Sequence, residues 1–334
     1  MLRDEWVIVQ LLVQTGGLAL LLGATVFSFR LIRTWSEHHH SEAQIRLERQ
    51  SYLLGAVLAV VFWSQALSLL FFLHTVNVHL TEQIEGAMCA TGILGLNDFG
   101  YPLLFLKLLA LGIYGSYLIC NHFDNREPGY PLTPFKFWLL FPATALLILD
   151  VYLSFRFFGQ ISPSIITTCC SVSFAPASSP AFGWFAPGAG LHLAKWGFHG
   201  GFGLLCLAIG WAIYKKPVSF GFWLALGLVG LVYVSSAVYA LRYEYVKYIY
   251  GLPTHLCMFD IFWLHYGGIG YVIFGTYAGL LFGLLYRGLY AWFSPRLAPL
   301  APRSEQFWGG AMGSFLCLSY LVPLGYQWAW GYAL

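Results

Sequence analysis

Long apolar segments separated by short polar linkers dominate the 334-residue chain. Each apolar segment runs for about 20 residues with few charges, the length that an α-helix needs to cross a ~30 Å hydrocarbon layer. The pattern predicts an all-α, polytopic integral membrane protein, a bundle of about eight transmembrane helices. The expected spans cover residues 6–29, 51–75, 99–120, 137–158, 193–214, 219–241, 262–286 and 307–332.

The linker over residues 159–192 is the longest outside the expected spans. It contains four prolines and several aromatic side chains, and proline restricts the backbone around it. We therefore expect an ordered loop that folds back onto the bundle, with no separate soluble domain. Residues 1–334 are accordingly interpreted as one transmembrane domain.

Composition agrees with this interpretation and narrows the function. The chain is 59% hydrophobic and 9% charged, whereas a soluble domain has about 25% charged residues. A formal net charge of +3 is too small to predict nucleic-acid binding. The lipid bilayer is the first partner that the sequence implies.

The basic residues lie mostly on one side of the predicted membrane. Alternate linkers place eleven Lys and Arg on one side and three on the other, and the basic side of a membrane protein is cytoplasmic. Both termini are then extracytoplasmic. The protein is expected in the cell inner membrane. The eleven are Arg30, Arg33, Arg46, Arg49, Arg126, Lys136, Lys215, Lys216, Arg287, Arg296 and Arg303; the three are Arg3, Arg242 and Lys247.

Four of the seven cysteines fall in loops predicted to be extracytoplasmic: Cys89, Cys169, Cys170 and Cys257. Three hypotheses remain open for them. Since such a compartment permits disulfides, Cys89 and Cys257 could each bridge to one of the adjacent pair and staple three loops.

The second hypothesis is a soft-metal site, because Met88 precedes Cys89, Met258 follows Cys257, and His255 is two residues away. Sulfur ligands select copper(I). The third is thiol–disulfide exchange, although the Cys-X-X-Cys signature of membrane thiol oxidoreductases is absent. Together they predict thiol or copper-like metal handling with an extracytoplasmic thiol or metal-carrier protein as partner.

Ionisable residues inside the spans supply a different hypothesis. Lys107 and Asp150 lie at similar depths in consecutive spans, so an intramembrane ion pair is expected. A structural salt bridge and a role in a transporter pathway both fit such a pair.

Two histidines support a further alternative. His199 in the fifth span and His265, placed just inside the seventh, are expected at one depth. Histidines on two helices can hold haem b axially or contact a quinone headgroup. The alternative function is therefore a membrane subunit of a respiratory electron-transfer complex, with other membrane subunits as partners.

Overall fold

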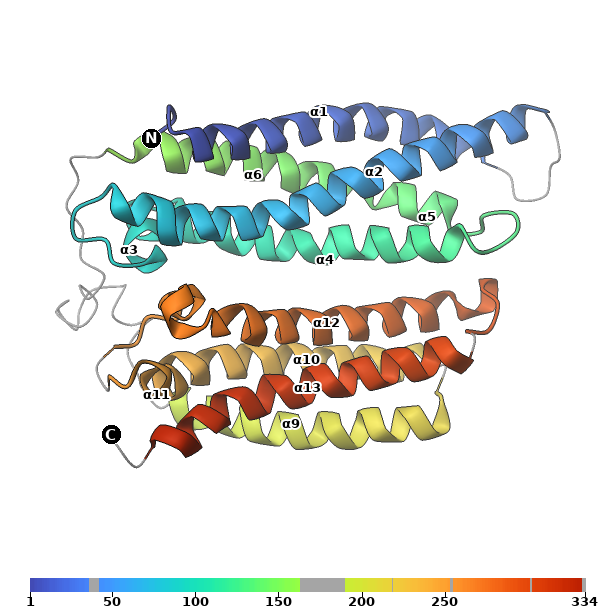
Figure 1. The fold of residues 1–334 in the computed structure, drawn as a ribbon. Coiled ribbons are helices and arrows are strands. Elements are labelled where there is room, and N and C mark those ends of the chain that lie inside the picture. The colour runs from blue at the N-terminus through green and yellow to red at the C-terminus, as the bar shows by residue number, and fades with distance from the viewer. Residues whose placement is uncertain (36–41, 163–189, 218, 253–254, 301, 332–334) are drawn as a thin grey trace. The chain divides into compact units, whose positions relative to one another are not determined.

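The computed structural model describes residues 1–35, 42–162, 190–217, 219–252, 255–300 and 302–331, and the regular elements in these ranges are all helical (Figure 1). The all-α prediction is confirmed, and eight of the helical segments are long and apolar enough to cross a membrane, which supports a multi-pass protein. Large apolar side chains such as Val26, Val60 and Leu207 are at least 70% exposed, as expected where helices face lipid.

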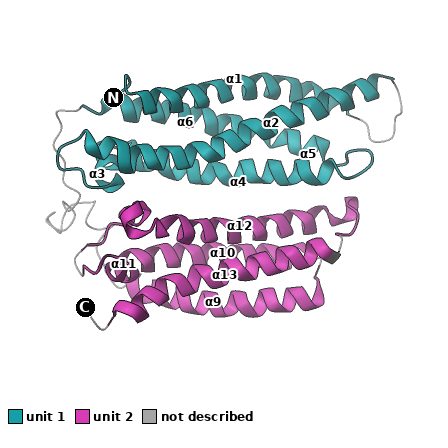
Figure 2. Cartoon of the chain, in the orientation of Figure 1, with its two compact units in different colours: residues 1–167 teal, residues 168–334 magenta. Residues whose placement is uncertain are grey.

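The helices cluster into two compact units, residues 1–167 and residues 168–334 (Figure 2). Each unit packs its own set of long helices around its own apolar core. The expectation of one transmembrane domain over residues 1–334 stays a prediction.

Unit 1 is a four-helix bundle. Its long helices pack in a ring, in which α1 and α4 each contact both α2 and α6. The amino group of Met1 donates to the carbonyl oxygen of Ile161 at 3.2 Å, so the start of α1 meets the end of α6 and these helices run antiparallel. The elements are α1 Glu5–Thr34, α2 Glu42–His74, α3 Ala90–Leu94, α4 Gly100–Asp124, α5 Thr133–Trp138 and α6 Leu140–Gln160.

Unit 2 has the same kind of ring, in which α9 and α12 each contact both α10 and α13. Phe198, Tyr233, Tyr277 and Leu280 are among the fully buried or nearly fully buried side chains of its core. The elements are α9 Gly190–Lys215, α10 Phe220–Ala240, α11 Val246–Tyr250, α12 Ile269–Phe293 and α13 Pro302–Trp330.

The two units repeat one plan. In each, the second long helix continues into a π-helical turn, Thr75–His79 in unit 1 and Leu241–Tyr245 in unit 2. A loop with short helical turns and one cysteine follows before the third long helix. An isoleucine with no exposed surface lies four residues after each cysteine, Ile93 after Cys89 and Ile261 after Cys257. The loops that carry these cysteines are therefore equivalent parts of a duplicated architecture.

Helix ends differ from the predicted spans where local chemistry sets them. The Asp4 side chain accepts hydrogen bonds from the amides of Trp6 and Val7 and starts α1, which extends to Thr34. The predicted span over 262–286 begins only at Ile269. Gly267 and Gly268 have φ values of 69° and 61°, a left-handed conformation that a continuous right-handed helix does not contain. Short 3₁₀ turns precede them, and His265 lies in one, Leu264–Tyr266.

The fourth span is interrupted near its start. α5 and α6 are separated at Leu139, three residues before Pro142, which has no amide hydrogen for an α-helical bond to Trp138. Together the two helices form a continuous candidate span of 28 residues, Thr133–Gln160.

Candidate functional site

A polar centre lies inside the bundle of unit 1. The Nζ atom of Lys107 on α4 lies 2.9 Å from Oδ2 of Asp150 on α6, and both side chains are at most 5% exposed. The sequence analysis expected this pair from the depths of the two residues alone. The ring of Phe72 on α2 lies beside the ammonium, with its centroid 5.6 Å from Nζ.

Two glutamines join the ion pair from the other helices of the bundle. Nε2 of Gln14 on α1 donates to Oδ2 of Asp150 at 3.3 Å. Gln65 on α2 donates through Nε2 to the carbonyl oxygen of Val13 at 3.4 Å. All four long helices of unit 1 therefore contribute a buried polar side chain at or near one level of the bundle.

Several atoms of this centre have no hydrogen-bond partner among the described residues. They include Oδ1 of Asp150, Oε1 of Gln14 and Oε1 of Gln65. One helical turn away, the side-chain amide of Gln10 and the hydroxyl of Ser154 also have no hydrogen-bond partner among the described residues. Since a buried polar group without a partner is costly, especially within a membrane, this cluster is a candidate binding site.

The sequence analysis singled out the charged residues of this centre and missed its neutral ones. Gln10 and Gln14 are four residues apart and so share one helical face, and most other residues buried on that face are apolar, among them Val7, Leu11 and Leu21. Two glutamines on the buried face of a predicted membrane helix are the signal that could have identified them.

A second candidate site is the loop after α11 in unit 2. Nε2 of His255 lies 2.6 Å from Oδ2 of Asp260, which is buried. A carboxylate oxygen of Asp260 also lies within 4.8 Å of the Cys257 sulfur. Tyr250 donates its hydroxyl hydrogen to the carbonyl oxygen of Cys257 and packs its ring against His255, so it fixes the loop from α11.

The order of residues explains how this loop brings the Asp260 carboxylate to both His255 and Cys257. Gly251, with φ of 67°, ends α11 in the left-handed conformation and turns the chain back. Asp260 then begins a 3₁₀ turn, Asp260–Phe262. Sequence analysis proposed His255 and Cys257 as ligands and did not assign Asp260, whose carboxylate adds a charged oxygen donor. Met258 is half-buried beside them.

The equivalent loop of unit 1 holds its cysteine differently. Cys89 is fully buried at the start of α3, where the amide of Ala90 donates to Oδ1 of Asn77 at 2.9 Å. Met88 beside it is 67% exposed.

The predicted disulfide staple needs residues that the structure does not describe. Cys169 and Cys170 lie outside the described residues, and no disulfide joins two of the cysteines inside them. The staple stays a prediction.

His199 and His265 occupy different settings. Nδ1 of His199 lies 2.9 Å from the hydroxyl oxygen of Tyr320, and Nε2 lies 3.5 Å from that of Tyr245. Both ring nitrogens thus face tyrosine hydroxyls, whereas an axial haem ligand needs one nitrogen directed at the iron. His265 is exposed in its 3₁₀ turn and contacts the ring of Tyr266.

Charged residues also hold the helix ends in both units. In unit 1, Asp124 and Lys136 are fully buried, with Nζ and Oδ2 2.6 Å apart. Asp124 also accepts from the amide of Leu132 and the hydroxyl of Thr133. This cluster fixes the turn between α4 and α5.

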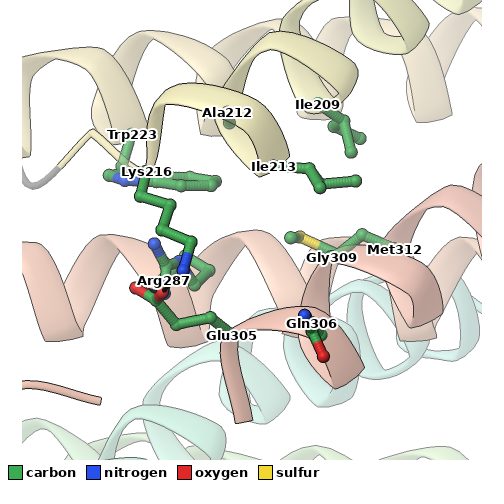
Figure 3. A pocket seen from close by; sticks show the side chains of 10 residues that line it. All are labelled: Ile209, Ala212, Ile213, Lys216, Trp223, Arg287, Glu305, Gln306, Gly309 and Met312. Atoms are coloured by element: carbon green, nitrogen blue, oxygen red, sulfur yellow. Dashed lines mark ion pairs between the residues drawn. The ribbon is translucent and has the colours of Figure 1, made fainter. Parts of the chain in front are cut away.

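In unit 2, Glu305 near the start of α13 faces two basic residues, Lys216 and Arg287, at 3.1 and 3.7 Å (Figure 3). These residues line a small pocket with Trp223, whose ring lies under the Arg287 guanidinium. The carboxylate and the guanidinium in this pocket face each other, so the cluster joins the ends of α9, α12 and α13.

Comparison with the models of known families, with curated proteins and with solved structures found no match to this chain. The function is therefore argued from the two sites themselves.

Proposed function

We propose that this protein is an inner-membrane protein that binds a transition-metal ion, with copper as the first candidate, at the extracytoplasmic loop of unit 2. His255, Cys257 and Asp260 are the proposed ligands. The observation that carries the proposal is the His255–Asp260 contact at 2.6 Å with the Cys257 sulfur within 4.8 Å of the same carboxyl group.

The donor set fits a thiophilic metal. Thiolate is a soft ligand that favours copper(I) and also binds zinc, imidazole binds both metals, and the carboxylate adds a second negative charge. A thiolate with a carboxylate balances the charge of a divalent ion such as zinc(II). Metal binding would replace the His255–Asp260 hydrogen bond by bonds of about 2.0–2.3 Å to the ion.

The proposed membrane topology places the metal-binding loop on the extracytoplasmic side. With the basic linkers in the cytoplasm, the loop faces the compartment where a metal-carrier or thiol-bearing protein could deliver or remove the ion. Reporter fusions after residues 40, 126, 216 and 300 should report cytoplasm, and fusions near residues 90, 180 and 250 should report the outside. A cytoplasmic signal near residue 250 would remove the proposed exchange with an extracytoplasmic carrier.

Metal titration of the purified chain tests the site. Copper(I) or zinc(II) is added against a competing chelator, and bound metal is measured by elemental analysis. We expect one equivalent in the wild type and an affinity at least tenfold weaker in Cys257→Ser and in Asp260→Asn, since each substitution removes a ligand. Cys317→Ser, an exposed cysteine of α13, is the matched control and should bind as the wild type does.

Equal affinity in Cys257→Ser and in the wild type would contradict the proposal. Cys89→Ser, measured in the same series, reports whether the equivalent loop of unit 1 adds a ligand. If Cys89→Ser weakens metal affinity and Cys257→Ser does not, the metal site is in unit 1 and not in unit 2.

A further inference from the structure

The polar centre of unit 1 has an excess of hydrogen-bond acceptors. Nε2 of Gln14 donates to the Asp150 carboxylate, and Nε2 of Gln65 donates to a backbone carbonyl, so both amide orientations are set by acceptor partners. At each glutamine, the side-chain carbonyl oxygen is left without a hydrogen-bond partner among the described residues. With Oδ1 of Asp150, three oxygens in the bundle core accept no hydrogen bond from any described residue.

These oxygens come from neighbouring positions. Gln14 contacts Asp150 directly, and Gln65 lies against Val13 and Gly17, which flank Gln14 on α1. A group that satisfies the three oxygens must donate hydrogen bonds or carry positive charge. Carboxylate and amide oxygens are hard ligands, of the kind that bind sodium or calcium rather than copper.

We propose that Asp150, Gln14 and Gln65 form a binding site for a small monovalent cation of the size of Na⁺, and that the bound cation exchanges with a proton of Lys107. The site is separate from the metal-binding loop of unit 2, and neither proposal depends on the other.

Charge balance requires the exchange. Lys107 and Asp150 as a pair have no net charge, and a second cation beside the ammonium would add an uncompensated charge to a buried site. When Na⁺ binds the Asp150 carboxylate, one N–H bond of Lys107 breaks, the proton leaves to solvent and the amine stays neutral. Each cation that enters releases one proton, and the formal charge of the site stays zero.

Few side chains contact the Lys107–Asp150 pair among the described residues. On α4, Lys107 and Tyr114 are the titratable side chains that interact with Asp150. α1 presents Gln14 to the carboxylate, and α2 presents the Phe72 ring to the ammonium. Among the described residues that contact the pair, no second carboxylate competes for the cation.

Polar residues mark a route to one end of the bundle. Gln10 and Ser154 are each one turn nearer than Gln14 and Asp150 to the end where α1 begins and α6 finishes. Both are buried, and their side-chain polar atoms have no partners among the described residues. Toward the other end, Leu21, Leu58, Phe62, Leu140 and Leu147 are part of the core. The proposed entry for the cation is therefore the end of the bundle where α1 begins.

The test uses the full-length protein purified in detergent, with choline chloride replacing NaCl at constant ionic strength. Two measurements are made: the thermal unfolding midpoint against Na⁺ concentration, and proton release on Na⁺ addition in weakly buffered solution with a pH indicator. We expect a midpoint that rises with Na⁺ and not with choline, since a ligand that binds the folded state stabilises it. About one proton should leave per bound cation.

Neutral variants separate the site from general stability. Gln14→Met and Gln65→Met keep the side-chain volume and remove the amide group with its carbonyl oxygen, so each should weaken the apparent Na⁺ affinity about tenfold or more, since one hydrogen-bond-sized contact is worth about that factor. Thr144→Val, which removes a hydroxyl bonded to Thr25 elsewhere in the bundle, is the control and should keep the full response.

A wild type that responds equally to Na⁺ and choline would overturn the proposal. So would glutamine variants with the affinity of Thr144→Val. Na⁺ binding without proton release in the wild type would overturn the exchange with Lys107.

Discussion

The ammonium of Lys107 lies 2.9 Å from Oδ2 of Asp150, and neither side chain is more than 5% exposed. A buried ion pair of this kind is weak evidence of stability, because the cost of removing two charges from water offsets much of their attraction. Loss of one partner is a different matter, since it leaves a single charge in the core of a membrane bundle.

Asp150→Asn alone should therefore destabilise the protein strongly, by about 3–5 kcal/mol as for other buried pairs. Lys107→Met combined with Asp150→Asn removes both charges and should recover part of the loss. Folded yield and the thermal unfolding midpoint are the measurements. A double variant no better than either single variant would show that the two charges do not compensate each other.

Two clusters at helix ends allow a direct comparison of buried and exposed ion pairs. Asp124 and Lys136 are at most 1% exposed, whereas Arg46 and Glu42 at the start of α2 are at least 80% exposed. Asp124→Asn leaves a buried ammonium and should cost about 3–5 kcal/mol. Glu42→Gln should leave the unfolding midpoint almost unchanged, because exposed pairs are screened by water. Equal shifts of the unfolding midpoint for the two variants would contradict this reasoning.

The spans and the buried ion pair could be predicted because both depend on patterns along one helix. Charge-poor segments of about 20 residues identify membrane helices, and the positions of Lys107 and Asp150 within their spans gave their depths. The start of α12 could not be predicted the same way, since apolar residues from 262 onward continue the hydropathy pattern through Gly267 and Gly268. The left-handed conformation at those two glycines sets the boundary.

The candidate sites needed three-dimensional information for a different reason. Gln14 and Gln65 are 51 residues apart, and only the packing of α1 on α2 brings them to one level. In unit 2, the loop conformation places the Asp260 carboxylate on His255, and spacing alone does not distinguish that contact from an exposed acidic side chain.

The end of unit 1 where α1 begins should respond to acid. Oδ2 of Asp4 lies 2.8 Å from Nε2 of His79 and accepts from Gln83 at 3.0 Å. Burial by itself would raise the pKa of the Asp4 carboxyl. Hydrogen bonds from Gln83, His79 and the Val7 amide, with the charge of His79, outweigh burial and hold that pKa below its ordinary value of 3.8.

A lowered pKa means that Asp4 stabilises the folded state above about pH 4 and loses this contribution as pH falls through the folded-state pKa. Asp4→Asn should therefore lower the unfolding midpoint at pH 6, and the gap to the wild type should shrink at pH 3. A gap of the same size at both pH values would show that the Asp4 charge contributes no stability.

Adjacent glycines on α1 offer the sharpest test of the polar centre. A Cβ atom at Gly17 would lie 2.5 Å from Nε2 of Gln65, whereas one at Gly16 meets no atom within 4 Å. Gly16→Ala should be neutral or stabilising by up to about 1 kcal/mol, because alanine favours helix. Gly17→Ala must displace the Gln65 amide, so it should reduce the Na⁺-dependent rise of the unfolding midpoint as Gln65→Met does. The same Na⁺ response in both alanine variants would mean that Gln65 does not bind the cation.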